Sequence, residues 1–316
     1  MRALLCPDSL KGVLTAREAA AALREGFGGG GVELPIADGG EGTADAIGGE
    51  LRSASVSDPL GRPVVASWRV CDGVAVVDSA AAIGLPLLAE SERDPMRASS
   101  AGLGELLLAV LAEIPREVIV GVGGTATVDG GAGLLGVLSS WPEGVRLRVA
   151  CDVRATLLDA ARVFAPQKGA TAVQVAELEQ RLATSAALAP FADLPGAGAG
   201  GGLGAALASI GGELVEGAEL VLDAVGFDDH ARNVDLVVTG EGTVDATTFT
   251  GKAPGAVVKR CDGLGVRCVL FGGRVLEGAA IALSGDPSRA REDLLALGER
   301  LARGVDLDPR LDGGVA

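Results

Sequence analysis

The chain has 316 residues, of which 48% are apolar, and its 27 basic and 42 acidic side chains give a net charge of −15. This apolar content suffices for a sizeable core and excludes a largely disordered chain, and the length suggests about two domains at roughly 150 residues each. The negative charge would repel nucleic acid and anionic membrane surfaces, so we expect neither as a partner. Residues 1–6 are too short for a signal peptide and no apolar stretch is long enough to cross a membrane, which predicts a cytoplasmic protein.

The first elements alternate between strands and helices. The apolar run 3–6 predicts a strand buried on both faces, and the capping-box pattern T-A-R-E at the start of 15–27 predicts a helix. A strand at 32–37 and a helix at 43–51 follow. Two strand–loop–helix units in succession indicate a parallel α/β sheet.

The pattern changes near residue 53. Three short segments separated by turns, 53–58, 64–70 and 73–79, predict an antiparallel patch. Strands and helices alternate again beyond it. The elements predicted there are helix 101–113, strand 117–121, strand 147–151, helix 173–189, a helix opened by the glycine-rich stretch 195–204, strand 235–239, strand 266–271 and helix 289–303.

These patterns predict an α/β protein of two domains. One is a parallel α/β sheet formed discontinuously by residues 1–55 and 233–316. The other is a mixed α/β domain, residues 56–232, inserted into the first.

Glycine is unusually common, with 49 residues, about twice the ordinary share. Ten of these glycines fall in four loops that follow apolar strands and also carry Asp or Glu: residues 8–12, 38–43, 123–131 and 240–245. Parallel strands deliver their C-terminal loops to one crevice, glycine lets the backbone approach a ligand, and carboxylates can hold Mg²⁺. A tight turn with a capping Asp is the alternative for each loop alone, but four such loops favour a site.

Lysine is scarce, with only four residues against 23 arginines. Lys11, Lys168 and Lys252 each neighbour a glycine, whereas Lys259 lies within a predicted helix and is expected at the surface. A compact ammonium group suits a phosphate or a carboxylate ligand. The three glycine-flanked lysines are therefore candidate site residues.

Several other sites are excluded or weakly supported. The chain has no P-loop motif, and its G-x-G-x-x-G match at 196–201 follows Pro195 rather than a strand, which argues against a nicotinamide-dependent dehydrogenase. The only histidine, His230, is more typical of a solvated helix end than of a catalytic triad. Phosphoryl transfer is the chemistry that remains, because it needs an anion cradle, Mg²⁺ ligands, ammonium groups and a carboxylate to accept a proton.

Taken in order, the loops resemble the glycerate kinase type I family. The matching blocks are P-D-S-L-K-G at 7–12, A-D-G-G-E-G-T at 37–43, P-L-G-R at 59–62, the stretch 121–133, A-C-D-V at 150–153, and the stretches 164–170, 195–204 and 238–254. The resemblance implies ATP-dependent phosphorylation of D-glycerate with Mg²⁺, on the 2-hydroxyl. It also implies that one of the two domains is Rossmann- or flavodoxin-like and that the active site lies in the cleft between the domains. We further expect a monomer or a homodimer. The chain departs from the family at 154–159 and 98–102, which indicates either an altered substrate preference or only a drifted loop.

The resemblance and the loop chemistry together give a map of expected roles. The expected catalytic residues are Lys11, Asp152, Lys168 and Asp245, with Asp152 or Asp245 as the group that deprotonates the hydroxyl. The expected substrate- and phosphate-binding residues are Asp8, Ser9, Gly39, Gly40, Gly123, Gly124, Thr125, Asp129, Gly240, Glu241 and Lys252. The expected Mg²⁺ ligands are Asp38 and Glu41. The alternatives are a kinase for another small hydroxy acid or sugar acid, and a non-catalytic small-anion-binding protein of the same fold.

Overall fold

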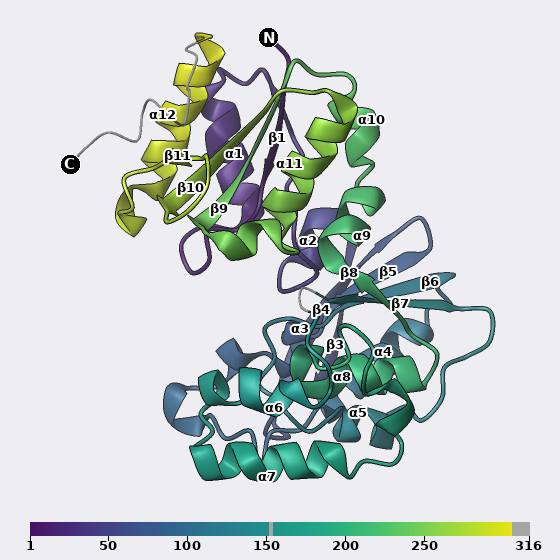
Figure 1. Ribbon diagram of the computed structural model, residues 1–316. Coiled ribbons are helices and arrows are strands. Elements are labelled where there is room, and N and C mark those ends of the chain that lie inside the picture. Colours follow the sequence, from purple (N-terminus) through teal and green to yellow (C-terminus); the bar gives the residue numbers. More distant parts are fainter. Residues whose placement is uncertain (152–153, 305–316) are drawn as a thin grey trace. The chain divides into compact units, whose positions relative to one another are not determined.

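A computed structural model describes residues 1–151 and 154–304 (Figure 1). The chain divides into two compact units, which we call unit 1 (Met1–Asp38 together with the chain from Ala218 onward) and unit 2 (Gly39–Gly217). The chain therefore passes from one unit to the other between residues 38 and 39 and between residues 217 and 218. The predicted domain boundaries were 55/56 and 232/233. Each unit is described by itself below.

Two local features explain these different boundaries. Strand β3 (Glu50–Ser57) pairs along its whole length with β4 (Pro63–Cys71), so residues 50–55 belong to the sheet of unit 2. Helices α9 (Gly217–Ala224) and α10 (Phe227–Ala231) bury apolar side chains in a core of unit 1, with Leu222 and Phe227 fully buried. Residues 218–232 therefore belong to unit 1.

Unit 1 contains a five-stranded sheet in which every pair is parallel. Its strands are β1 (Ala3–Pro7), β2 (Gly31–Glu33), β9 (Leu236–Val244), β10 (Cys268–Val275) and β11 (Ile281–Ala282), in the spatial order β11-β10-β9-β1-β2. Counted along this unit, the order is 2-1-3-4-5, which is the flavodoxin-like rather than the Rossmann arrangement. Of the two sheets that the sequence analysis named, the structure has the flavodoxin-like one.

Helices cover both faces of this sheet (Figure 1). One face packs against α1 (Ala16–Gly26) and α12 (Ala290–Ala302), and the other against α9, α10 and α11 (Ala253–Leu264). Helices α1 and α12 approach each other closely at glycines. A Cβ on Gly26 would lie 2.1 Å from the backbone oxygen of Leu295, and one on Gly298 would lie 2.5 Å from that of Leu23.

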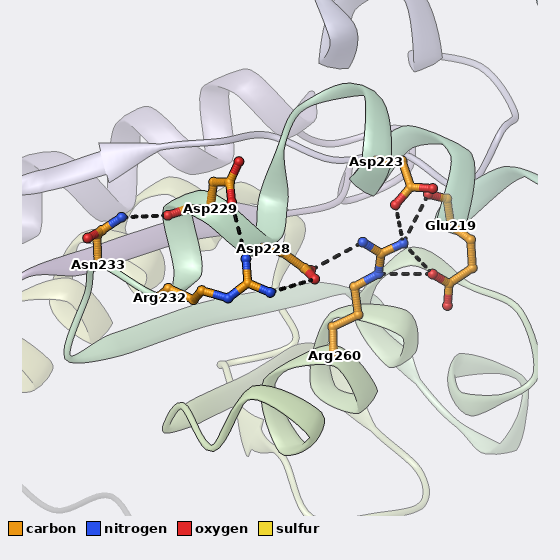
Figure 2. A network of polar contacts seen from close by, with 7 residues as sticks. All are labelled: Glu219, Asp223, Asp228, Asp229, Arg232, Asn233 and Arg260. Carbon is orange, nitrogen blue, oxygen red and sulfur yellow. Dashed lines mark hydrogen bonds and ion pairs between the residues drawn. The ribbon is translucent and has the colours of Figure 1, made fainter.

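Arg260 on α11 joins the three helices of one face (Figure 2). Its guanidinium donates to Glu219 at 2.6 Å, to Asp223 at 2.7 Å and to Asp228 at 3.2 Å. Glu219 and Asp223 belong to α9, and Asp228 belongs to α10. One largely buried cation thus forms ion pairs with carboxylates from two helices.

Unit 2 contains a mixed six-stranded sheet in the order β3-β4-β5-β6-β7-β8. Its remaining strands are β5 (Val74–Asp78), β6 (Glu117–Gly121), β7 (Arg146–Cys151) and β8 (Glu213–Glu216). The pairs β3·β4 and β4·β5 are antiparallel and the others parallel, so the predicted antiparallel patch continues directly into a parallel sheet. A mixed α/β unit was predicted, and this sheet has that character.

The helices of unit 2 contribute to two hydrophobic cores. Their bounds are α2 (Thr43–Ile47), α3 (Ala80–Ile83), α4 (Ala101–Leu111), α5 (Ala132–Val137), α6 (Asp159–Phe164), α7 (Ala172–Ala183) and α8 (Ala199–Ser209). The first core joins the sheet to α4, α5 and α8, with Leu103, Val120 and Leu203 fully buried. A second core lies among α6, α7 and α8. Short 3-10 turns complete the described fold: Leu85–Leu87, Glu90–Glu92, Pro166–Lys168, Ala189–Phe191, Ala246–Phe249 and Pro287–Arg289.

The predicted helix 43–51 is shorter in the structure and ends at Ile47. Gly48 and Gly49 follow with φ of +80° and +107°, which a helix does not accommodate. A Cβ on Gly49 would lie 2.4 Å from the backbone oxygen of Val70. The two glycines therefore end the helix and start β3.

Among the residues that the structure describes, no helix combines the length and apolar character needed to cross a bilayer.

Candidate active site

In unit 1, the loop after β1 lies beside the C-terminal end of β9. The backbone N–H of Asp8 donates to the backbone oxygen of Gly240 at 2.9 Å, and a Cβ on Gly242 would lie 3.6 Å from Cα of Leu10. The chain leaves β1 toward the face covered by α1, and leaves β9 toward the face covered by α11. This divergence is the topological switch point of the sheet, where open α/β folds bind ligands.

Three carboxylates that the sequence analysis assigned to the site influence one another here. Burial of the Asp8 carboxyl, followed by repulsion from Asp38, raises the pKa of Asp8 to about 8, and Glu241 adds to the shift. A hydrogen bond at 2.5 Å from the backbone N–H of Ser9 opposes it only in part. Carboxyl groups are therefore crowded at the ends of β1 and β9, and Asp8 holds its proton more readily than an ordinary Asp.

Glu241 is nevertheless well paired. Lys252 donates to Oε2 at 2.8 Å, and the Thr248 hydroxyl donates to Oε1 at 2.6 Å. Lys252 stands at the N-terminal cap position of α11. The predicted Glu241 and Lys252 are thus brought together, each partly neutralising the other.

Asp245 makes local hydrogen bonds of the capping type. Its carboxylate accepts from the backbone N–H of Thr247 at 2.8 Å and from the Thr247 hydroxyl. These hydrogen bonds, the side-chain bond first, hold the pKa of Asp245 below its usual range. A lowered pKa makes it a poorer proton acceptor, so this geometry favours the capping alternative for Asp245.

A pocket of about 380 Å³ opens beside these loops, wholly within unit 1. Its wall combines cationic, acidic, glycine and apolar residues contributed by both strand-end loops, by β10 and by the segment 283–293. The lining residues are Ser9, Leu10, Lys11, Val13, Glu241, Gly242, Thr243, Lys252, Gly273, Arg274, Leu283, Gly285, Asp286, Pro287, Ala290 and Asp293. Four of the predicted site residues, Ser9, Lys11, Glu241 and Lys252, thus line one cavity.

In unit 2, the loop 39–42 packs against the loop after β6. A Cβ on Gly123 would lie 2.6 Å from Cα of Gly40, and one on Gly121 would lie 2.8 Å from the backbone oxygen of Gly39. A Cβ on Gly124 would lie 3.5 Å from a carboxylate oxygen of Glu41. The predicted residues Gly39, Gly40, Glu41, Gly123 and Gly124 are therefore neighbours, and glycine permits the close approach.

Asp78 holds this arrangement and was not predicted. Its two carboxylate oxygens accept from the backbone N–H groups of Gly42 at 2.9 Å and Ala44 at 3.0 Å. Burial of the carboxyl raises its pKa to about 6 despite these hydrogen bonds. Its position directly after the apolar run 74–77 was a usable signal, but the loop that follows lacks the glycines that marked the other four.

Asp129 organises the end of the loop 123–131 from within. Its carboxylate accepts from the backbone N–H and hydroxyl of Ser100 at 2.9 and 2.8 Å, and from the backbone N–H groups of Gly131 and Gly133 at 3.0 and 3.1 Å. These four bonds occupy the carboxylate in joining α4 and α5. Its expected contact with a substrate stays a prediction.

Lys168 is buried, with 4% of its surface exposed. Its ammonium donates to the Thr125 hydroxyl at 3.1 Å and to the backbone oxygen of Thr127 at 2.8 Å. Burial lowers the pKa of Lys168 to about 7, against the opposing effect of Asp129. The structure thus places the predicted Lys168 and Thr125 in hydrogen-bond contact inside unit 2, with the charge of the predicted Asp129 acting on Lys168.

The glycine-rich stretch 195–204 supports the same loop. Gly200, Gly201 and Gly202 all have positive φ, and a Cβ on Gly201 would lie 2.1 Å from the backbone oxygen of Thr127. This contact explains the glycine at that position. The predicted catalytic Asp152 lies outside the described residues.

The predicted residues thus form two sets, one at the switch point of unit 1 and one around the loops 39–42 and 121–131 of unit 2. In residues 1–151 and 154–304, no three or more His, Cys, Asp or Glu side chains come together as a metal site. The fold and loops define a class of protein, a flavodoxin-like α/β unit carrying an inserted mixed α/β unit, each with glycine- and carboxylate-rich loops at strand ends.

Comparison with known proteins identifies the family within this class. The profile of the Glycerate kinase family matches residues 3–141 and 137–287. The chain is 38% identical over 305 residues to Glycerate 2-kinase of Escherichia coli K12, with 80% of each chain covered. It is 37% identical over 326 residues to Glycerate kinase of Bacillus subtilis 168, with 87% of this chain and 85% of the relative covered.

A solved structure agrees with this relationship. The crystal structure of a protein assigned as glycerate kinase 2 from Salmonella typhimurium LT2 superimposes with a TM-score of 0.81 at 30% identity, covering 96% of this chain and 98% of the other. The protein belongs to the glycerate kinase family, as the resemblance noted in the sequence indicated.

Proposed function

We propose that this protein transfers the γ-phosphoryl group of ATP to D-glycerate in a Mg²⁺-dependent reaction, giving 2-phosphoglycerate. The observation that carries the proposal is the match to the Glycerate kinase family across residues 3–287. The position of transfer rests on the Escherichia coli relative, which is named Glycerate 2-kinase.

The residues at the switch point of unit 1 fit a bound Mg²⁺. The pKa of Asp8 is raised to about 8 by burial and by its neighbours Asp38 and Glu241, and a nearby divalent cation would relieve that repulsion. Mg²⁺ commonly binds through one or two carboxylates together with substrate phosphate oxygens, so a complete protein cage is not needed. Asp8 and Asp38 are the proposed ligands here, and Glu41 stays a predicted ligand. When bound, the ion would neutralise charge on the transferred phosphoryl group.

The remaining roles follow from charge and exposure. Lys11 is exposed and lines the pocket, so its ammonium can contact a phosphate or the glycerate carboxylate. Lys168 is buried and already donates to Thr125 and Thr127, so we assign it to holding the loop 123–129. Asp152 stays the predicted base, because the carboxylate of Asp245 is engaged as a cap.

The test is turnover by the purified protein with D-glycerate, ATP and Mg²⁺, followed by ³¹P NMR of the product. A phosphate on C2 couples to one proton and gives a doublet, whereas a phosphate on C3 couples to two and gives a triplet. A doublet is expected. A triplet would contradict the position, and no ATP consumption would contradict the proposal itself.

The same assay separates the two alternatives. A kinase for another hydroxy acid would consume ATP faster with tartronate or glycolate than with D-glycerate. A non-catalytic binding protein would consume ATP with none of them while still binding the acid in a thermal-shift assay. A cytoplasmic location, a monomer or homodimer, and the absence of nucleic-acid and membrane partners stay expectations.

A further inference from the structure

We propose that the pocket of unit 1 is the nucleotide site, with the phosphates held near Lys11 and Arg274 and the base against the apolar wall formed by Leu10, Val13 and Leu283. The inference rests on the proposed function, since it assigns that reaction's phosphoryl donor to one unit.

The pocket's place in the fold is the first argument. It opens at the carboxyl ends of β1, β9 and β10, beside the switch point of a sheet with the flavodoxin-like strand order. Ligands of such sheets bind in the crevice at this point. Gly242 and Gly273 line it, and a Cβ on Gly273 would lie 2.6 Å from the backbone oxygen of Gly242, so backbone rather than side chains faces the cavity there.

Uncommitted positive charge is the second argument. Neither Lys11 nor Arg274 makes a side-chain hydrogen bond or ion pair with any residue that the structure describes, although the chain carries a net charge of −15. In so acidic a protein, two cations that line one pocket and pair with no described carboxylate are suited to an anionic ligand. Arginine and lysine are the usual donors to phosphate oxygens.

The apolar wall distinguishes a nucleotide from glycerate. Leu10 and Val13 come from the loop after β1, while Leu283, Pro287 and Ala290 come from the segment 283–293. A volume of about 380 Å³ is in the range of clefts for larger ligands, roughly 300–1000 Å³. Glycerate has only three carbons, all bearing oxygen, and would leave these apolar surfaces in contact with water. A purine base would cover them.

The acidic residues that line the pocket are compatible with a nucleotide whose phosphates lie near Lys11 and Arg274 and whose base lies on the apolar wall. Glu241 is paired with Lys252, and Asp286 accepts from the backbone N–H and hydroxyl of Ser288 at 2.9 and 2.7 Å. Asp286 and Asp293 belong to the same segment as the apolar residues, and Asp293 accepts from the backbone N–H of Ser284 at 3.1 Å and from the Ser284 hydroxyl. A carboxylate there can accept hydrogen bonds from ribose hydroxyls, as acidic residues do in dinucleotide-binding folds.

The test is calorimetric titration of the full chain with Mg·AMP-PNP, an ATP analogue that is not hydrolysed, and separately with adenosine, each with and without D-glycerate. Arg274→Ala should weaken Mg·AMP-PNP binding about tenfold to a hundredfold, the worth of one charge-assisted hydrogen bond, and leave adenosine binding unchanged. Val13→Glu places a charge on the apolar wall and should weaken both ligands. Lys259→Ala and Val32→Glu are matched controls, because both residues are exposed in unit 1 and neither lines the pocket.

Several outcomes would overturn the inference. Wild-type affinity in both pocket variants would place the nucleotide elsewhere, and so would an effect confined to the KM for glycerate. Failure of the native protein to bind Mg·AMP-PNP under either condition would also overturn it. If the variants lower nucleotide affinity but no glycerate is phosphorylated, the nucleotide site stands and the proposed function fails.

Discussion

The ammonium nitrogen of Lys168 lies 2.8 Å from the backbone oxygen of Thr127, and both residues are buried within unit 2. A second hydrogen bond at 3.1 Å reaches the hydroxyl of Thr125. One buried side chain thus fixes two points of the loop that follows β6. These contacts support the proposed role of Lys168 in holding the loop, and its expected role at a substrate stays a prediction.

The pH dependence of stability should reveal this buried lysine. Burial lowers the pKa of Lys168 to about 7 in the folded protein, against an ordinary value of 10.5. Between these values the unfolded chain binds a proton that the folded chain does not, so stability rises with pH. Relative to Lys168→Met, the free energy of unfolding of the native protein should increase by up to about 1.4 kcal/mol per pH unit above pH 7.

Urea denaturation of both proteins at pH 7, 8 and 9 measures this difference. Lys259→Met is the control, since Lys259 is exposed and its removal should leave the pH slope unchanged. Parallel stability curves for the native protein and Lys168→Met would show that the ammonium is not desolvated as the structure indicates.

Asp78 should be needed for the loop 39–42. Asp78→Ala removes the acceptors of two backbone N–H groups, Gly42 and Ala44, and each unsatisfied group costs about 1–3 kcal/mol. We expect the free energy of unfolding to fall by about 2 kcal/mol or more, with a loss of glycerate turnover of at least about tenfold. Asp45→Ala removes a more exposed carboxylate that pairs with Arg69 at 2.8 Å, and should cost less than about 1 kcal/mol. Equal effects of the two substitutions in urea denaturation would contradict this role.

Much of the fold was predictable because local patterns agreed with the final structure. The strand 117–121 has the predicted bounds, since its apolar run is also buried on both faces of a sheet. The T-A-R-E pattern at 15–18 forms the expected capping box. The domain boundaries differed because they depend on distant contacts, such as the pairing of Glu50 with Val70, that no local pattern reveals.

In the candidate site, too, features set by neighbouring residues were predictable, whereas contacts between residues far apart in the sequence were not. Glycine and carboxylates at strand ends made Asp8, Glu241 and Gly123 candidates, and the structure places all three at or near the C-terminal end of a strand. The burial of Lys168 depends on Thr125 and Thr127, about 40 residues earlier in the chain. Asp78 was missed because its partners, Gly42 and Ala44, precede it by more than 30 residues.

Gly201 should tolerate no side chain. Its φ is +77°, and a Cβ would lie 2.1 Å from the backbone oxygen of Thr127. Gly201→Ala should therefore cost about 3 kcal/mol or more, combining backbone strain with a clash against the loop that Lys168 also holds. Gly211→Ala is the matched control, because Gly211 has φ of +104° but nothing within 4 Å, and it should cost about 1–2 kcal/mol. If thermal denaturation gave the two variants the same midpoint, the contact with Thr127 would not constrain this position.

Arg260 should contribute more to stability than its neighbour Arg232 (Figure 2). The Arg260 side chain is 17% exposed and serves Glu219, Asp223 and Asp228, whereas that of Arg232 is 56% exposed. Arg260→Met leaves three carboxylates without their shared cation, and should lower the free energy of unfolding by about 2 kcal/mol. Arg232→Met should cost less than about 1 kcal/mol, as is usual for exposed ion pairs.

Raising the ionic strength tests whether charge causes the loss of stability expected for Arg260→Met. Salt screens repulsion among exposed carboxylates, so the gap between the native protein and Arg260→Met should narrow in 1 M NaCl. Arg260→Lys should lie between them, because an ammonium cannot donate to several carboxylates in the fixed geometry of a guanidinium. A gap that does not change with salt would indicate that the arginine acts through packing of its aliphatic stem between α9 and α11, rather than through its charge.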